Sequence, residues 1–215
     1  MLSMMNPYNN CSALSNTCFI TMETLVKQRM TPARWQHTYR CMIYATELAL
    51  LYRQDVEPVQ VAALLHDAFR DSSTADFYRY ASEFAYSADA FENGHPVLLH
   101  GPLAACWAAA DLGITDQAIL DAIRFHTTGS PGLGAVATVV YIADALEPGR
   151  SYPAAPDLRQ AIEKLSLQEA ALLVLKHGLQ HLISSNEPIS PLSVLWYNEL
   201  LRSGYGESMD IEQTI

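Results

Sequence analysis

Apolar residues recur three and four positions apart through most of the chain between Met22 and Leu201, and no stretch alternates apolar and polar residues as a half-buried strand does. Helix-start signals accompany this period, because Thr31-Pro32 and Ser190-Pro191 each pair an N-cap residue with a first-turn proline. The sequence therefore predicts an all-α fold. Since 50% of the 215 residues are apolar, we expect one sizeable core and a single domain.

The expected helices cover the middle of the chain and leave both ends outside the domain. They are predicted over residues 32–52, 58–69, 73–89, a segment that follows a loop at 92–96 and reaches Asp111, then 115–126, 135–146, 157–184 and 191–201. Residues 1–21 are rich in Asn, Ser and Met and are predicted to form a flexible N-terminal tail. Residues 204–215 are polar and are predicted to form a C-terminal tail, which leaves 22–203 as the helical domain.

Charge and cysteine usage exclude several classes of protein. The 13 lysine and arginine residues against 23 aspartate and glutamate residues give a net charge of −10, which disfavours nucleic acid and membrane surfaces as partners because both are polyanions. The four cysteines lack C-x-x-C spacing, as is typical of free thiols in a reducing compartment such as the cytoplasm. No apolar run is long enough for a membrane span, and no secretory signal is recognised. We expect a cytoplasmic protein, and a homodimer stays open.

Two segments place a histidine on an apolar helix face. The pair His66-Asp67 lies near the C-terminal end of an apolar helix, where the partial negative charge of the helix carbonyls favours a cation. His37 shares a face with Cys41 and Tyr44, so its imidazole is expected to point inward and to need a partner. These residues are consistent with a metal site. A core histidine bonded to a backbone carbonyl is the alternative for each of them taken alone.

Further side chains of the same kind follow later in the chain. His100 lies in the first turns of a helix, and His126 ends the apolar stripe of the next one. Asp144 is aligned with apolar residues of the helix at 135–146, and a carboxylate there is costly to bury without a cation or several donors. The turn at Thr127-Thr128 offers hydroxyls that either cap the helix or bind a phosphate.

This set of residues, in this order, resembles the HD metal-dependent phosphohydrolases. The resemblance is most specific to the YqeK family, whose motif string is similar to Leu64-Leu65-His66-Asp67, Leu99-His100-Gly101-Pro102, His126-Thr127-Thr128-Gly129, Ala143-Asp144 with Glu147-Pro148-x-Arg150, and Leu158-Arg159. It covers the chain from about Met22 to Leu201. Two departures are Arg70, where the family usually has lysine, and Asp144-Ala145-Leu146-Glu147, where it has Asp-Tyr-Ile-Glu. Neither departure removes a ligand.

The resemblance implies a single HD-type helical bundle and a symmetrical bis(5′-nucleosyl)-tetraphosphatase, which cleaves diadenosine tetraphosphate into two ADP. It implies a core set of metal ligands, namely His37, His66, Asp67 and Asp144. His100 and His126 match positions that either complete a second metal site or approach the phosphates. Iron is favoured by the resemblance, as one ion or two, while manganese and zinc also suit a mixed imidazole and carboxylate set.

The candidate catalytic residues are Asp67, His100 and His126, and bound metal would lower the pKa of a water from about 15.7 toward 7. The candidates for binding the nucleotide substrate are His100, His126, Thr127, Thr128, Asp144, Arg150, Arg70, Ile189 and Pro191. Of these, Arg150 and Arg70 offer forked donors to phosphate. The segment at 188–191 is similar to the family's closing element and is the expected wall for a nucleoside.

Three alternatives to this activity stay open. A di-iron oxygenase of the HD superfamily would use the same six ligands to open a carbon bond. An HD hydrolase of another nucleotide, such as a guanosine alarmone or a deoxynucleotide, would share the chemistry but not the substrate. A non-catalytic nucleotide sensor is disfavoured, because no metal position has been replaced.

Overall fold

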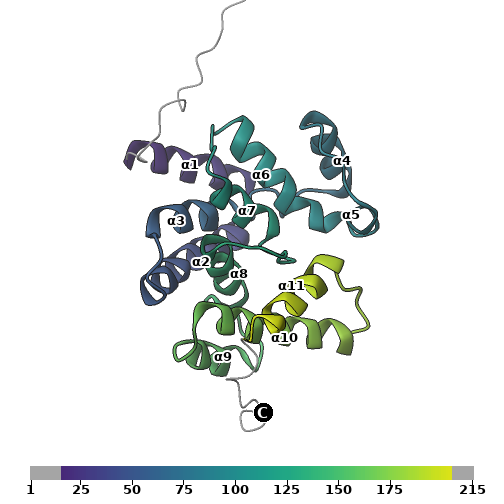
Figure 1. Cartoon of the computed structure of the whole chain (residues 1–215). Helices are drawn as coiled ribbons and strands as arrows, with labels where there is room; N and C mark the ends of the chain where they lie inside the picture. Colours follow the sequence, from purple (N-terminus) through teal and green to yellow (C-terminus); the bar gives the residue numbers. More distant parts are fainter. Residues whose placement is uncertain (1–15, 205–215) are drawn as a thin grey trace, which may run out of the picture.

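The computed structural model describes residues 16–204, and over this range the chain forms helices and no strand, which confirms the predicted all-α class (Figure 1). In chain order the elements are α1 (Asn16–Arg29), α2 (Pro32–Leu51), α3 (Val56–Leu65), α4 (Thr74–Glu83), α5 (Ala90–Gly94), the 3₁₀ turn η1 (Pro96–Leu99), α6 (His100–Ala110), α7 (Gln117–Phe125), α8 (Ala135–Leu146), α9 (Ala155–Ile162), α10 (Leu167–Ser184) and α11 (Pro191–Arg202). None of the described helices is both long and apolar enough to cross a membrane.

Local sequence sets the start of the helices that carry the site. The Thr31 hydroxyl accepts a hydrogen bond from the backbone NH of Arg34 and begins α2, with Pro32 in the first turn. Asp55 caps α3 through the NH of Glu57. Such caps satisfy backbone donors that have no partner inside the helix, and each contributes about 1 kcal/mol. The predicted starts at Thr31 and Ser190 are thereby confirmed.

The predicted N-terminal tail was too long at its inner end. Helix α1 begins at Asn16, so the last six residues of the predicted tail, 16–21, are helical, whereas residues 1–15 and 205–215 lie outside the described residues. Met22 is 1% exposed and Val26 is fully buried, and Phe19 packs against the same core. Tertiary packing against the core therefore stabilises this helix.

Other boundaries differ where a cap was overlooked. The long helix predicted from Asp157 to Ser184 is two helices, because Ser166 and Glu169 form a capping box that starts α10. Asp116, and not the predicted Thr115, caps α7. The predicted loop at 92–96 contains the end of the short helix α5 and the first residue of η1.

The centre of the bundle consists of α2, α3, α7 and α8. Helix α2 packs against α3 and α8, and α7 packs against the same two helices, while α6 covers α7. Five consecutive residues of α3, Val61 to Leu65, are fully buried, as expected for a helix with neighbours on all sides. Helix α10 packs on α8, and α11 packs on α10; in Figure 1 α9, α10 and α11 form the lower part of the molecule, and α4 and α5 lie in its upper part. The ends of α3, α6 and α7 meet in the middle of this arrangement.

Candidate metal centre

Six side chains from five helices and their ends converge inside the bundle. They are the six predicted ligands, His37 on α2, His66 and Asp67 at the end of α3, His100 at the start of α6, His126 at the end of α7, and Asp144 on α8. All are buried except Asp144, whose side chain is 20% exposed. The structure thus brings together residues as far apart in the chain as 37 and 144.

The carboxylate of Asp67 lies between two pairs of imidazoles. Its Oδ2 is 3.7 Å from Nε2 of His37 and 3.6 Å from Nε2 of His66. Its Oδ1 is 3.4 Å from Nε2 of His100 and 3.5 Å from Nε2 of His126. Since each oxygen faces a different pair, one carboxylate is shared by two sets of donor atoms, and within each set the atoms lie no more than 4.8 Å apart.

Asp144 completes the first of these sets. Its Oδ1 is 3.0 Å from Nε2 of His37 and 3.9 Å from Nε2 of His66. Burial would raise the pKa of Asp144, but the hydrogen bond with His37 and the neighbouring positive groups outweigh it and hold this pKa well below its usual range. The thiol of Cys41, buried beneath the set, lies within the same 4.8 Å of His66 and Asp144, a neighbour that the sequence interpretation missed.

Three of the histidines have their ring orientation fixed by a local contact. In each, Nδ1 lies against the carbonyl oxygen three residues earlier in the chain: His66 on Ala63 at 2.7 Å, His126 on Ile123 at 2.8 Å, and His100 on Val97. A carbonyl oxygen only accepts, so Nδ1 must carry the proton and donate it. In the neutral ring Nε2 is then a lone-pair atom, and in all three residues it points at Asp67.

The lone pair of His66 has no donor, and those of His100 and His126 face each other with the Thr127 hydroxyl as their one neighbouring donor among the described residues; a metal ion would satisfy all three. Nε2 of His66 is buried without a hydrogen-bond partner, and Nε2 of His100 is 2.9 Å from Nε2 of His126. Burial lowers the pKa of His66 to about 4 and also lowers that of His100, so both rings stay neutral near pH 7. Neutral imidazoles and carboxylates are ligands for divalent first-row metals. The residues present therefore fit such an ion.

The missing side chain of Gly101 allows the second pair of histidines to meet. A Cβ at this position would lie 2.7 Å from the carbonyl oxygen of Arg124 and 3.1 Å from that of Ile123, closer than side-chain atoms approach backbone. Glycine thus lets the start of α6 approach the end of α7 closely. This approach carries His100 to His126.

Glu147 supports the first pair, a role that was not predicted from the sequence. It is 1% exposed; its Oε1 lies 3.1 Å from Nδ1 of His37, and its Oε2 accepts from Nε of Arg40 at 2.7 Å and from the NH of Gly149 at 2.6 Å. Burial would raise the pKa of Glu147, but the bond from Arg40 outweighs it and lowers this pKa. The charged carboxylate can therefore hold the proton of His37 on Nδ1 and leave Nε2 free for a cation.

We expect Glu147→Gln to weaken metal binding while the fold is retained. The substitution keeps the shape of the side chain but removes the negative charge that makes His37 a better ligand, and loss of such a contact costs roughly 10- to 100-fold in metal affinity. Titration of metal-free protein with a divalent ion measures this. Glu169→Gln is the matched control, because Glu169 belongs to a helix cap on α10. Equal metal affinity of Glu147→Gln and wild type would contradict this role.

Arg34, which was not predicted as a site residue, is an arginine that donates to Asp67, whereas Arg70 was predicted as a donor to phosphate. Nη1 of Arg34 donates to Oδ2 of Asp67 at 2.8 Å, and Nε of Arg34 lies 3.5 Å from Oδ1 of Asp71. Arg34 precedes His37 by one helical turn, and this spacing is the signal that could have revealed it. Within residues 16–204, no hydrogen bond or ion pair joins the Arg70 side chain to the centre.

Two of the predicted substrate residues contact the centre directly. The hydroxyl of Thr127 is 3.0 Å from Nε2 of His126 and 3.3 Å from Nε2 of His100. Arg150 donates through Nη2 to Oδ1 of Asp144 at 2.7 Å and through Nε to the Asp144 carbonyl at 2.9 Å. Thr127 thus lies at the pair His100 and His126, and Arg150 lies at Asp144, next to the other pair.

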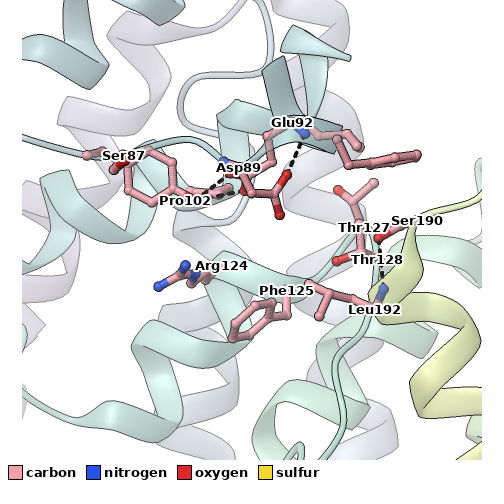
Figure 2. A pocket seen from close by; sticks show the side chains of 13 residues that line it. Ser87, Asp89, Glu92, Pro102, Arg124, Phe125, Thr127, Thr128, Ser190 and Leu192 are labelled. Atoms are coloured by element: carbon pink, nitrogen blue, oxygen red, sulfur yellow. Dashed lines mark hydrogen bonds between the residues drawn. The ribbon is translucent and has the colours of Figure 1, made fainter. Parts of the chain in front are cut away.

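A pocket opens beside Thr127 (Figure 2). Its walls come from residues 86–98, Pro102, the end of α7 with the following turn, and the start of α11. From α11 the lining residues are Ser190 and Leu192, the neighbours of the predicted wall residues Ile189 and Pro191. The turn is held by Gly129, which has a left-handed φ of +65° and no room for a Cβ against the Trp196 ring. Thr128 lines the pocket, and its carbonyl accepts from the Ser193 hydroxyl at 2.7 Å.

The profile of the HD domain family matches residues 34–149, more than half of the chain. The chain belongs to the HD family. The matched range begins at Arg34 and includes all six converging residues together with Glu147. The HD family match and the cluster of histidines and aspartates together indicate a divalent metal ion.

Two curated relatives of this HD protein are similar to it over nearly their whole length. A protein of Halalkalibacterium halodurans is 35% identical and one of Bacillus subtilis is 32% identical, each over 82% of this chain and 94% of the relative, and both are named symmetrical bis(5′-nucleosyl)-tetraphosphatase. A crystal structure from Clostridium acetobutylicum, described as a predicted HD superfamily hydrolase involved in NAD metabolism, matches with a TM-score of 0.80 and 26% identity over 86% of this chain and 97% of that one. The family resemblance of the motifs is thereby confirmed.

Proposed function

We propose that this HD protein is a metal-dependent hydrolase that cleaves dinucleoside tetraphosphates symmetrically, so that diadenosine tetraphosphate gives two ADP. The observation that carries this proposal is the 32 to 35% identity, over most of both chains, to two proteins named for that activity. The site supports it as well, because every one of the six ligand positions holds a side chain able to bind metal. A sensor that has lost catalysis would be expected to have lost some of them.

Symmetric hydrolysis adds one water across the central P–O–P bridge. The water oxygen forms a bond to one of the two inner phosphorus atoms, and the bond from that phosphorus to the bridging oxygen breaks. Each half leaves as ADP, and the water gives up a proton. A divalent metal bound here supplies positive charge beside the phosphates and lowers the pKa of its water ligand toward about 7.

The position of each residue in the centre suggests its role in this reaction. We assign His37, His66, Asp67 and Asp144 to the first metal site, and we assign His100 and His126, with the other oxygen of Asp67, to a second site. As catalytic residues we assign Asp67, His100 and His126, because the two histidines contact Thr127 at the pocket and Asp67 lies against both of them.

The phosphates of the substrate need cationic and hydroxyl donors in a protein with a net charge of −10. We assign Thr127, Thr128 and Arg150 to them, and Arg34 supplies a second guanidinium on the opposite side of the metal-binding carboxylates. Fork-shaped guanidinium donors suit phosphate oxygens.

We further propose iron as the metal, the cytoplasm as the compartment and a homodimer as the assembly. The imidazole and carboxylate donors suit iron as they suit manganese and zinc, and the family resemblance favours iron.

The products of one reaction test the function. Metal-loaded protein is incubated with diadenosine tetraphosphate with and without dioxygen, and the nucleotides are separated. We expect ADP alone in both cases. AMP with ATP would mean attack at an outer phosphate, a strict requirement for dioxygen would indicate an oxygenase, and intact substrate would contradict the proposal.

A further inference from the structure

The pocket beside the metal centre differs in chemistry from one end to the other. At its inner end is the hydroxyl of Thr127, next to the histidines of the second pair, and Thr128 follows it in the pocket wall. At its outer end is Arg124, which in Figure 2 extends away from these two threonines and toward Ser87. A nucleotide whose phosphates lie at the metal centre would therefore direct its base toward the outer end.

Aromatic rings form part of the pocket wall, and two of them lie close to Arg124. Tyr86, Phe91 and Phe125 all line the pocket and come from two separate segments of the chain. The guanidinium carbon of Arg124 lies 5.6 Å from the centre of the Tyr86 ring and 5.1 Å from that of Phe125. Nucleobases stack on aromatic rings and on guanidinium planes, and this stacking discriminates little between bases.

Arg124 brings the NH donors of a guanidinium group to the pocket. It is the only basic side chain among the described residues that line the pocket, and no ion pair of the described residues includes it. The nearby acids are engaged in their own segment: Asp89 accepts from the NH of Glu92 at 2.8 Å, and Glu92 accepts from the NH of Asp89 and from the Tyr86 hydroxyl at 2.7 Å. The guanidinium of Arg124 can therefore donate to a ligand.

We propose that this pocket binds the base of one nucleoside and that Arg124 is a specificity-determining residue that favours purines. The proposal rests on the proposed function for the identity of the substrate. Purines present an N7 acceptor on the edge that Arg reads, and guanine adds O6, whereas pyrimidines lack N7. A guanidinium that donates to this edge separates purines from pyrimidines, while the stacking rings accept either.

The test compares three substrates on wild type, on one Arg124 variant and on one control variant. Initial rates are measured with diadenosine, diguanosine and diuridine tetraphosphates for wild type, for Arg124→Met, which keeps the length of the side chain but removes the donors, and for Arg202→Met, an exposed arginine at the far end of α11. Wild type is expected to prefer both purines. In Arg124→Met we expect kcat/KM to fall about tenfold for the two purine substrates, with little change for diuridine tetraphosphate, metal content or the Arg202→Met control.

Three results would overturn the assignment. One is a wild type without purine preference, another is an Arg124→Met variant that keeps the preference, and the third is an equal loss on all three substrates, which would place Arg124 on the phosphates. Competition between ADP and UDP for binding keeps the test separate from the proposed function. A protein that cleaves none of the tetraphosphates but binds ADP better than UDP, in a manner dependent on Arg124, would refute the hydrolysis and support the pocket; equal binding would refute the pocket.

Discussion

Asp67→Ala is expected to abolish metal binding and hydrolysis together. Each oxygen of Asp67 faces a different pair of imidazoles, and no other carboxylate of the described residues forms an ion pair with His100 or His126. The negative charge shared by the two sets therefore has no substitute nearby. Elemental analysis of the purified variant and separation of its products from diadenosine tetraphosphate give the two measurements.

Asp71→Ala is the matched control for this substitution. Asp71 lies four residues further along, is also close to Arg34, and accepts from the NH and hydroxyl of Thr31, but it contacts no histidine. Its loss should cost about 1 kcal/mol of stability through the hydrogen bonds to Thr31 and leave the metal content unchanged. Full metal occupancy and full activity in Asp67→Ala would overturn the assignment of the centre.

His126→Ala is expected to lower the metal content from about two ions per chain to about one, with a large loss of activity. A two-ion site needs both ions to hold the attacking and leaving oxygens. With His126 removed, His100 and one oxygen of Asp67 are the remaining members of the second donor set. Metal counting in parallel with ADP titration provides the test.

A different result would place His126 on the phosphate. In that case the metal count stays the same and the affinity for ADP falls by roughly 1.5 to 3 kcal/mol, the range for a hydrogen bond to a charged group. His177→Ala is the control, because His177 stacks on Tyr152 outside the centre. If metal count, ADP affinity and rate were all unchanged in His126→Ala, both roles would be excluded.

The helices could be predicted where their signals are local. The period of apolar residues and the caps at Thr31 and Ser190 depend only on neighbours in the chain, and these elements are confirmed. The break before α10 was missed because apolar residues continue through it at helical spacing, although Ser166 and Glu169 had the spacing of a capping box. Helix α1 packs against α3 and buries Met22, and a local sequence pattern does not reveal a contact between two helices.

The six converging residues could be predicted from the sequence because their types and their order along the chain match those of the HD phosphohydrolases. Their supporting residues could not, since support depends on which side chains meet in space. Glu147 reaches a histidine 110 positions earlier, and its place in the chain says nothing about that contact. Arg70 stays a predicted phosphate donor, whereas Arg34, from another helix, was not predicted and donates to the Asp67 carboxylate.

Because the ring orientations are fixed by the fold, the lifetime of the protein in the cell is expected to depend on the supply of metal. Carbonyl groups of the helix ends hold three imidazoles in one tautomer, so the folded chain presents an ordered set of lone pairs that the unfolded chain lacks. An ion that binds only the folded form raises the free energy of unfolding by RT ln(1 + [M]/Kd), about 2.7 kcal/mol when free metal is a hundred times Kd. When free metal is scarce, a larger fraction of the chains is therefore unfolded, and proteases degrade the unfolded chains. The amount of the protein in the cell would then depend on the metal supply and not only on the substrate.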